Sequence, residues 1–223
     1  MQSTARQSVV GMDIAKNVFQ LHLVDTETGE IQRHKLKREK VTTFFANRQK
    51  SLIAMEASAR LKDRVTHAVL VGTAYPMKVS PALIEASLNQ PEKALAMINV
   101  FSRSTLAAPP SALGPGTWVY GASMALGRRV LRSNPKVNVF HRGFVACDSY
   151  AGGEAAIRAV TCPVLFVLGA QDQMTQPKAA QSLIAAAKDS GKAVTVHTVP
   201  VGHHQMTEAP DDTLFALAKF LNR

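Results

Sequence analysis

The chain has 223 residues, 46% of them hydrophobic, and a formal charge of +10 at pH 7. Its two cysteines are too few for a disulfide framework or a cysteine-based zinc site. No run approaches the roughly 20 apolar residues of a membrane span, and the first ten residues lack a signal peptide's apolar stretch. We therefore expect a cytoplasmic protein without membrane contact. The charge is +3 over residues 1–58 and +7 over the remainder, and both parts mix signs as globular surfaces do.

The first elements alternate in hydrophobicity. Residues 17–25 place Val18, Gln20 and His22 against Phe19, Leu21 and Leu23, which is the period of a strand. We expect further strands at 8–12, 31–37 and 51–55, and a short helix at 39–48. The predicted order is three meandering strands, a helix and a strand.

From residue 64 the pattern changes. An apolar run from Val65 to Gly72 is typical of a strand that is buried on both faces of a parallel sheet. Helices separated at Pro91 are expected between 76 and 100, followed by an irregular segment at 102–118. The last third then alternates between strands and helices, which indicates a parallel α/β sheet. Its expected elements are a helix that ends with residues 155–160, strands at 163–169 and 193–199, and helices at 177–187 and 211–221.

Residues 94–147 contain six basic residues and no acidic ones. A solvated basic helix face explains this better than a nucleic-acid groove, because no aromatic residue is interleaved for base stacking in its basic cluster at 128–132.

Two carboxylates mark the amino-terminal region. Asp13 closes the first expected strand and Glu56 the fourth, so both can lie on one side of a sheet and bind a divalent metal for phosphodiester cleavage. On spacing alone, Asp13 can equally cap the turn that follows it, with Glu56 a solvated strand end.

The residues around Asp13 (11–19), together with 44–47 and 54–57, resemble DEDD transposases of the insertion-sequence-110 family. The resemblance covers residues 7–58 and implies a RuvC-like, ribonuclease-H-type domain with Asp13 and Glu56 as metal ligands. The family's two later acidic residues and its serine domain have no counterpart. We therefore expect at most weak Mg²⁺ binding at this fragment.

A second pair follows two later strands. Asp172 comes after the strand at 163–169, and His203 follows the strand at 193–199. A carboxylate and a histidine at these places match the orienting acid and general base of a Ser-His-Asp triad in its α/β-hydrolase order. Each residue alone is also common in loops.

The segments 64–74, 146–150, 162–165, 169–172, 202–203 and 208–210 resemble α/β-hydrolases of the esterase, lipase and C–C hydrolase type. The resemblance covers residues 62–223. It implies Asp172 and His203 as catalytic residues, a lid at 76–145, a small ester-like substrate and no cofactor. The adjacent His204 is a weaker candidate for the base.

The serine nucleophile should lie upstream of residue 62, where the sequence is transposase-like. Ser123 mimics the nucleophile motif but falls inside the expected lid, only 49 residues before Asp172. Ser58 is better placed, but Glu56 and Arg60 occupy positions that a nucleophile turn reserves for small residues. We expect neither serine to be the nucleophile.

The sequence thus predicts an α/β fold: a truncated α/β-hydrolase parallel sheet with its lid behind a partial ribonuclease-H-like β-meander. Three functions remain open: an inactive hydrolase-like protein, a transposase remnant with weak non-specific DNA binding, or a non-functional product of a gene interrupted by a mobile element. Strand 65–72 would lose its upstream neighbour, so we expect self-association through an exposed sheet edge.

Overall fold

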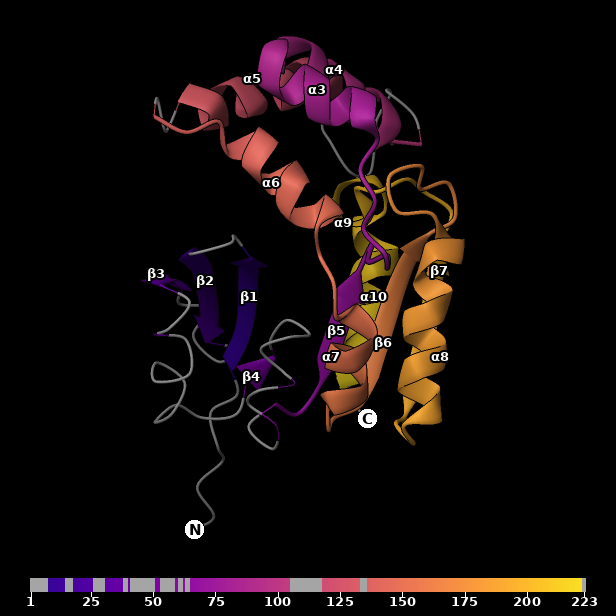
Figure 1. The fold of residues 1–223 in the computed structure, drawn as a ribbon. Helices are drawn as coiled ribbons and strands as arrows, with labels where there is room; N and C mark the ends of the chain where they lie inside the picture. The colour runs from indigo at the N-terminus through magenta and orange to yellow at the C-terminus, as the bar shows by residue number, and fades with distance from the viewer. Residues whose placement is uncertain are drawn as a thin grey trace. The chain divides into compact units, whose positions relative to one another are not determined.

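The computed structural model describes residues 8–14, 18–25, 31–37, 40, 51–52, 59, 62, 65–104, 118–132 and 136–221 (Figure 1). Apart from Lys40, the helix expected at 39–48 lies outside the described residues, as do Glu56 and Ser58. The chain divides into two units. The first comprises Met1–Leu70, Gly152–Phe166 and Leu183–Thr195, and the second comprises Val71–Ala151, Val167–Ser182 and Val196–Arg223.

A four-stranded sheet forms from the amino-terminal residues, with the order β3-β2-β1-β4. Its strands are β1 (Ser8–Ile14), β2 (Val18–Asp25), β3 (Ile31–Lys37) and β4 (Ser51–Leu52). The pairs β1–β2 and β2–β3 are antiparallel, whereas β1–β4 is parallel. The alternation at 17–25 thus forms the middle strand of a meander, and Asp13 faces Gln20 in the register.

A three-stranded sheet, ordered β5-β6-β7, forms from the later residues. Its strands are β5 (Ala68–Val71), β6 (Val164–Gly169) and β7 (Val194–Val199). Hydrogen bonds from Ala68 N to Pro163 O and from Gly72 N to Val167 O advance together along both strands, so β5 and β6 are parallel. Bonds from Val164 N to Ala193 O and from Ala170 N to Val199 O make β6 and β7 parallel as well.

The core of this sheet is β6, in which all six residues are buried. Its apolar run is therefore covered on both faces. The sequence predicted such burial for residues 65–72, but buried and half-buried residues alternate in β5. β5 is shorter than the expected 65–72, although Val65 ahead of it is also buried.

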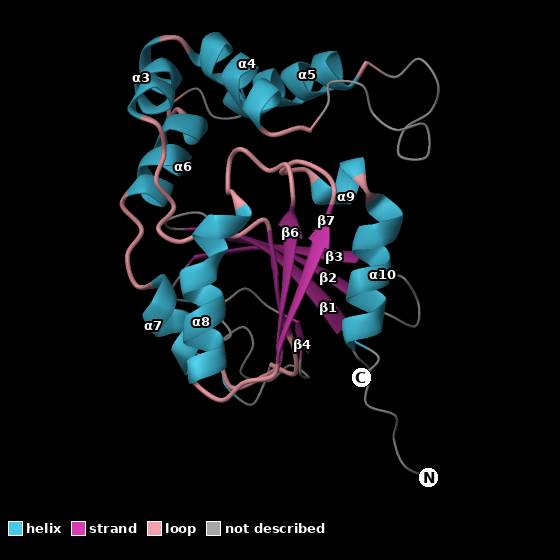
Figure 2. Cartoon of the chain, turned by 90° about the vertical axis from the view of Figure 1, so that its right-hand side faces the viewer, coloured by secondary structure: helices cyan, strands magenta, loops and turns pink. Residues whose placement is uncertain are grey.

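Between β5 and β6, the structure describes four helices in the second unit. They are α3 (Pro81–Asn89), α4 (Pro91–Phe101), α5 (Val119–Arg132) and α6 (Val139–Asp148). Both α3 and α4 begin with proline, which suits a first helical position because its missing N–H would have no partner there. Leu83, Ala86 and Ala94 are buried where α3 and α4 meet, with Phe144 of α6 against them. Figure 2 shows α3, α4 and α5 beyond the carboxyl ends of β6 and β7, in the region where a lid is expected.

The basic residues of α5 lie at its carboxyl end. Arg128, Arg129 and Arg132 are all exposed, and Arg128 forms an ion pair with Glu92 of α4 at 2.8 Å. Cations at a helix carboxyl end are favoured by the helix dipole. The basic face therefore has a structural explanation.

The remaining helices follow α6 in the chain. They are α7 (Gly153–Ala159), the 3₁₀ helix η3 (Pro177–Ala180), α8 (Gln181–Asp189), α9 (Gln205–Glu208) and α10 (Pro210–Leu221). The predicted helix at 177–187 thus begins as a 3₁₀ turn, and α9 was not expected. Within the part of the chain that the structure describes, no helix is long and apolar enough to cross a membrane.

Candidate acid–base site

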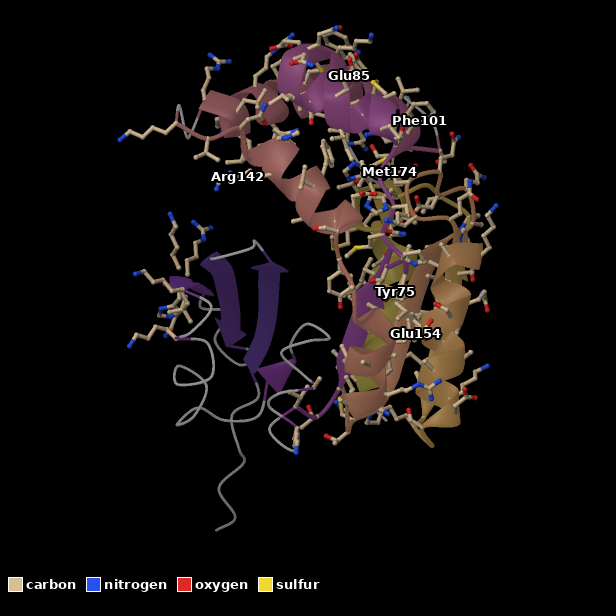
Figure 3. All side chains as sticks on the ribbon, in the orientation of Figure 1. Tyr75, Glu85, Phe101, Arg142, Glu154 and Met174 are labelled. Atoms are coloured by element: carbon tan, nitrogen blue, oxygen red, sulfur yellow. The ribbon has the colours of Figure 1, made fainter. Side chains whose placement is uncertain are left out.

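The carboxylate of Asp172 lies in the loop after β6, in the second unit. Its Oδ1 accepts the backbone N–H groups of Met174 and Thr175, both at 2.8 Å. Met174, labelled in Figure 3, marks this loop. Asp172 is only 3% exposed. A short acidic side chain that bonds its own backbone two and three residues ahead stabilises a tight turn, so the loop itself holds the carboxylate.

His203 completes the pair. Its Nδ1 lies 2.9 Å from Oδ2 of Asp172. The Thr175 hydroxyl lies 2.8 Å from the same oxygen, 3.0 Å from Nδ1 of His203 and 2.7 Å from the carbonyl oxygen of Gly72, after β5. Elements that follow all three strands thus meet at one point. The structure brings together the two residues that the sequence paired.

The protonation of the pair follows from its contacts. Burial alone raises the pKa of the Asp172 carboxyl, but hydrogen bonds from His203 and Thr175 outweigh it and leave this pKa below its ordinary value. An ionised carboxylate only accepts hydrogen bonds, so we assign the imidazole proton to Nδ1 of His203. Nε2 is then the basic nitrogen, as a general base requires.

Two glycines let the histidine loop approach β6. A Cβ on Gly169 would stand 2.2 Å from the carbonyl oxygen of Gly202. A Cβ on Gly202 would stand 2.5 Å from Ser104 N. No side chain fits at such distances, so both positions need glycine for His203 to reach Asp172.

A buried carboxylate that the sequence analysis did not single out fixes the same loop. Glu208 is 5% exposed, and its Oε2 accepts Ser104 N at 2.9 Å and Gly202 N at 3.4 Å. Its Oε1 accepts His204 N at 3.3 Å. In addition, His203 N donates to the carbonyl oxygen of Ser102 at 2.8 Å. Glu208 therefore ties the end of α4 to the histidine loop.

Thr175 and Gln205 were also missed. The amide of Gln205, oriented to satisfy its hydrogen bonds, accepts Gly169 N and donates to the carbonyl oxygen of His203. The only signal for Thr175 was its place three residues after Asp172. Glu208 lay in a quoted motif, but its role depends on Ser104, which no local pattern connects to it.

Ser123 is not bound to the histidine. Its hydroxyl accepts a hydrogen bond from Nη2 of Arg103 at 2.9 Å. Among the residues that the structure describes, no hydrogen bond reaches Nε2 of His203. Within those residues, therefore, no serine lies at Nε2 of His203.

The metal-site residues are only partly placed. Asp13 lies in β1, whereas Glu56 lies outside the described residues. No group of three or more His, Cys, Asp or Glu residues in the described part of the chain could hold a metal ion. Weak Mg²⁺ binding at Asp13 and Glu56 therefore stays a prediction.

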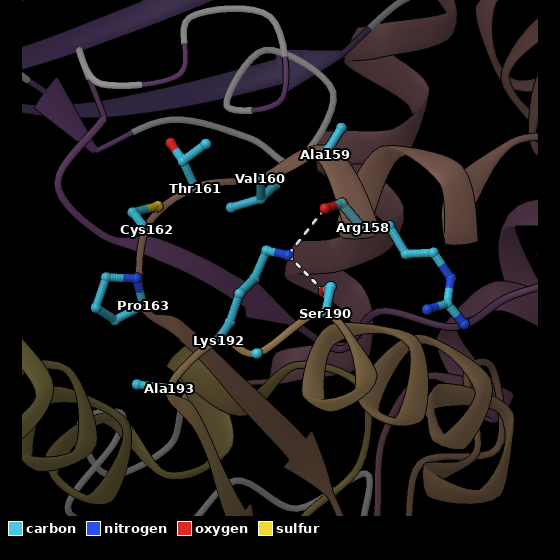
Figure 4. A pocket seen from close by; sticks show the side chains of 10 residues that line it. Arg158, Ala159, Val160, Thr161, Cys162, Pro163, Ser190, Lys192 and Ala193 are labelled. Atoms are coloured by element: carbon cyan, nitrogen blue, oxygen red, sulfur yellow. Dashed lines mark hydrogen bonds between the residues drawn. The ribbon is translucent and has the colours of Figure 1, made fainter.

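A pocket of about 450 Å³ lies in the first unit (Figure 4). It is lined by Arg158–Pro163 and Ser190–Ala193, which precede β6 and β7, whereas Asp172 and His203 follow these strands. Inside it, Lys192 Nζ donates to Ser190 Oγ and, at 2.9 Å, to the carbonyl oxygen of Arg158. Ligands of parallel α/β sheets bind outside the carboxyl ends of the strands, so this pocket is not the acid–base site.

No family model matches the chain. Over its amino-terminal part it is 46% identical across 50 residues to a protein described as a family 20 transposase from Pseudomonas aeruginosa, which is 22% of this chain and 15% of that one. It is 33% identical over 103 residues to a protein described as a transposase from Sinorhizobium fredii, covering 44% of this chain and 26% of that one. The chain thus spans only about a sixth to a quarter of these relatives.

Solved structures match a different type of protein. A thermophilic esterase superposes with a TM-score of 0.63 at 16% identity, over 96% of this chain and 97% of that one. An esterase from Exiguobacterium antarcticum superposes with a TM-score of 0.62 at 12% identity, over 83% of this chain and 71% of that one. An enol-lactonase from Burkholderia xenovorans superposes with a TM-score of 0.58 at 16% identity, over 83% of this chain and 69% of that one. The chain has an α/β-hydrolase fold. It joins this fold to a transposase-like amino-terminal sequence.

Proposed function

We propose that the chain is an α/β-hydrolase-like protein that keeps the acid and base of a Ser-His-Asp triad but lacks the serine. Its hydrolase part would be residues 62–223, with a lid at 76–145, and residues 1–58 would be the transposase-type fragment. The observation that carries the proposal is the 2.9 Å contact between Asp172 and Nδ1 of His203, together with the hydrogen bond that ties Ser123 to Arg103.

The chemistry of such a site is limited. In a complete triad, Asp172 would orient His203 and stabilise its imidazolium, and Nε2 would take the proton of the serine hydroxyl. No acyl-enzyme forms without a nucleophile, so the remaining acceleration comes from binding alone. Small carboxylic esters are the ligand class that we infer, because the proteins with this fold include esterases and a lactonase. No cofactor takes part.

Hydrolysis of an activated short-chain ester tests this proposal. We expect a rate indistinguishable from that of His203→Ala, without an initial burst of released alcohol. Rapid hydrolysis that is lost in Ser123→Ala or Ser58→Ala would identify a nucleophile and contradict the proposal.

A second function is favoured by one observation, the 46% identity to a transposase. We propose that any DNA binding by this chain is weak and independent of sequence. The charge of +10 supports contacts to phosphates.

A further inference from the structure

Residues 102–104 form one side of the acid–base site. Ser102 gives its carbonyl oxygen to His203 N, and Ser104 gives its N–H and its hydroxyl to Glu208. Arg103, between them, has its backbone in contact with Gly202. This short segment and the histidine loop are therefore locked together, and the Arg103 side chain begins beside the residue that carries the base.

The side chain of Arg103 uses only some of its hydrogen-bond donors. Its Nη2 donates to Ser123 Oγ at 2.9 Å, but its Nε is buried and has no hydrogen-bond partner among the described residues. The neighbouring Ser102 is 1% exposed, and its hydroxyl also lacks a partner there. Buried donors without partners are uncommon in folded proteins, because burying a donor without a hydrogen bond costs folding free energy. Two consecutive residues beside the histidine loop thus leave donors unused among the described residues.

The charge of Arg103 is also poorly balanced. Burial lowers the pKa of its guanidinium, and the Glu208 charge only partly opposes this. Glu208 makes no hydrogen bond to Arg103, since its oxygens are taken by Ser104, Gly202 and His204. Burial lowers the pKa of His204, and the Arg103 charge lowers it further, which places this cation near the histidine loop.

We propose that Arg103 binds the carboxylate of a ligand that lies against the Asp172–His203 pair. A guanidinium offers a planar set of N–H donors that matches the two oxygens of a carboxylate, and among the described residues only Ser123 binds one of its terminal nitrogens. This assignment rests on the proposed function and narrows its ligands to those that carry an acid group.

Binding of butanoate and of its neutral analogue butanamide to the whole chain tests the assignment by calorimetry. We expect the wild-type protein to prefer butanoate by about tenfold or more, the scale of one charge-assisted hydrogen bond. Arg103→Met should remove this preference, because it should weaken the binding of butanoate and leave the binding of butanamide unchanged. Arg129→Met is the matched control, because it removes one charge from an exposed position of α5, and it should keep the preference.

Arg103→Lys keeps the charge but loses the planar donors, and it decides the question if Arg103→Met does not fold. We expect it to weaken butanoate binding by at least about threefold without changing butanamide binding. Equal binding of the two ligands by the wild-type protein, or an unchanged preference in either Arg103 variant, would overturn the assignment. Monomethyl succinate carries both an ester and an acid group, so it shows whether the ligand of Arg103 is an acidic ester. Tighter binding than that of butanoate would indicate an acidic ester. Equal binding would indicate a simple carboxylic acid. None of these measurements needs turnover, so their failure is distinct from that of the ester test.

Discussion

Asp13 and Asp172 are both carboxylates at strand ends, but their regions differ in what surrounds them. Asp172 accepts hydrogen bonds from its own loop and from His203, and a second buried carboxylate, Glu208, fixes the histidine loop. Asp13 faces Gln20 across a meander, and no group of metal ligands occurs among the described residues. The region around Asp13 is similar in sequence to a transposase, whereas Asp172 lies in the α/β-hydrolase fold. A strand-end carboxylate is therefore most informative where the structure also describes the partners that hold it.

The largest effect that we expect concerns the edge of the hydrolase sheet. Among the described residues, β5 pairs with β6 on one side only, and Leu70 and Ala68 in it are buried. An apolar edge strand pairs readily with another chain, so size-exclusion chromatography should show association, with a broad thermal transition. Val69→Lys should shift the protein toward monomer. A wild-type chain that elutes as a monomer with one cooperative transition would contradict this expectation.

Asp172→Ala should cost about 3 kcal/mol of unfolding free energy, because it leaves N–H donors of Met174, Thr175 and His203 without an acceptor in a buried place. Denaturant unfolding measures this. The control is Asp211→Ala, at the exposed first turn of α10, which should cost less than about 1 kcal/mol. Equal losses of unfolding free energy in the two variants would mean that the hydrogen bonds of Asp172 stabilise the fold no more than an exposed helix-end carboxylate does.

Gly202→Ala should lower stability by about 1–3 kcal/mol, because its Cβ would stand 2.5 Å from Ser104 N and force the two backbones apart. Gly143→Ala is the matched control. It lies inside α6 with nothing within 4 Å of an added Cβ, so it should stabilise the protein by about 0.5–1 kcal/mol. Thermal melts of both variants measure the difference. An unchanged or raised melting temperature in Gly202→Ala would show that glycine is not needed for the close approach at this position.

The smallest effect should be at Asp13. We expect DNA binding by the wild-type chain to weaken steeply between low and physiological salt, without sequence preference, and Asp13→Ala to bind the same DNA equally. Fluorescence anisotropy at several salt concentrations tests this. Cleavage that requires Mg²⁺ and is lost in Asp13→Ala would show that the amino-terminal region keeps a working site.

Much of the fold followed from local patterns. Alternation gave β2 and β3, a continuous apolar run gave β6, and Pro91 separated α3 from α4. Boundaries were less predictable. The run from Val65 indicated a longer strand than β5, because burial of Val65 does not require strand pairing. The four residues of α9 are too few for a helical period to show.

The paired site residues were predictable because chain order places both after parallel strands of one sheet. The rest of the site was not. Glu208 works through Ser104, which is 104 residues away in the chain, and Arg103 stands out only because its Nε is buried without a partner. Such features depend on tertiary contacts between residues that share no local pattern.

The central claim is that the acid and base remain while the nucleophile is missing, and covalent labelling tests it most directly. A fluorophosphonate phosphonylates an activated serine, and intact-mass spectrometry counts the adducts. We predict no adduct on the native chain, and the same result for His203→Ala. A stoichiometric adduct that maps to one serine and disappears in His203→Ala would show a complete triad and contradict the account.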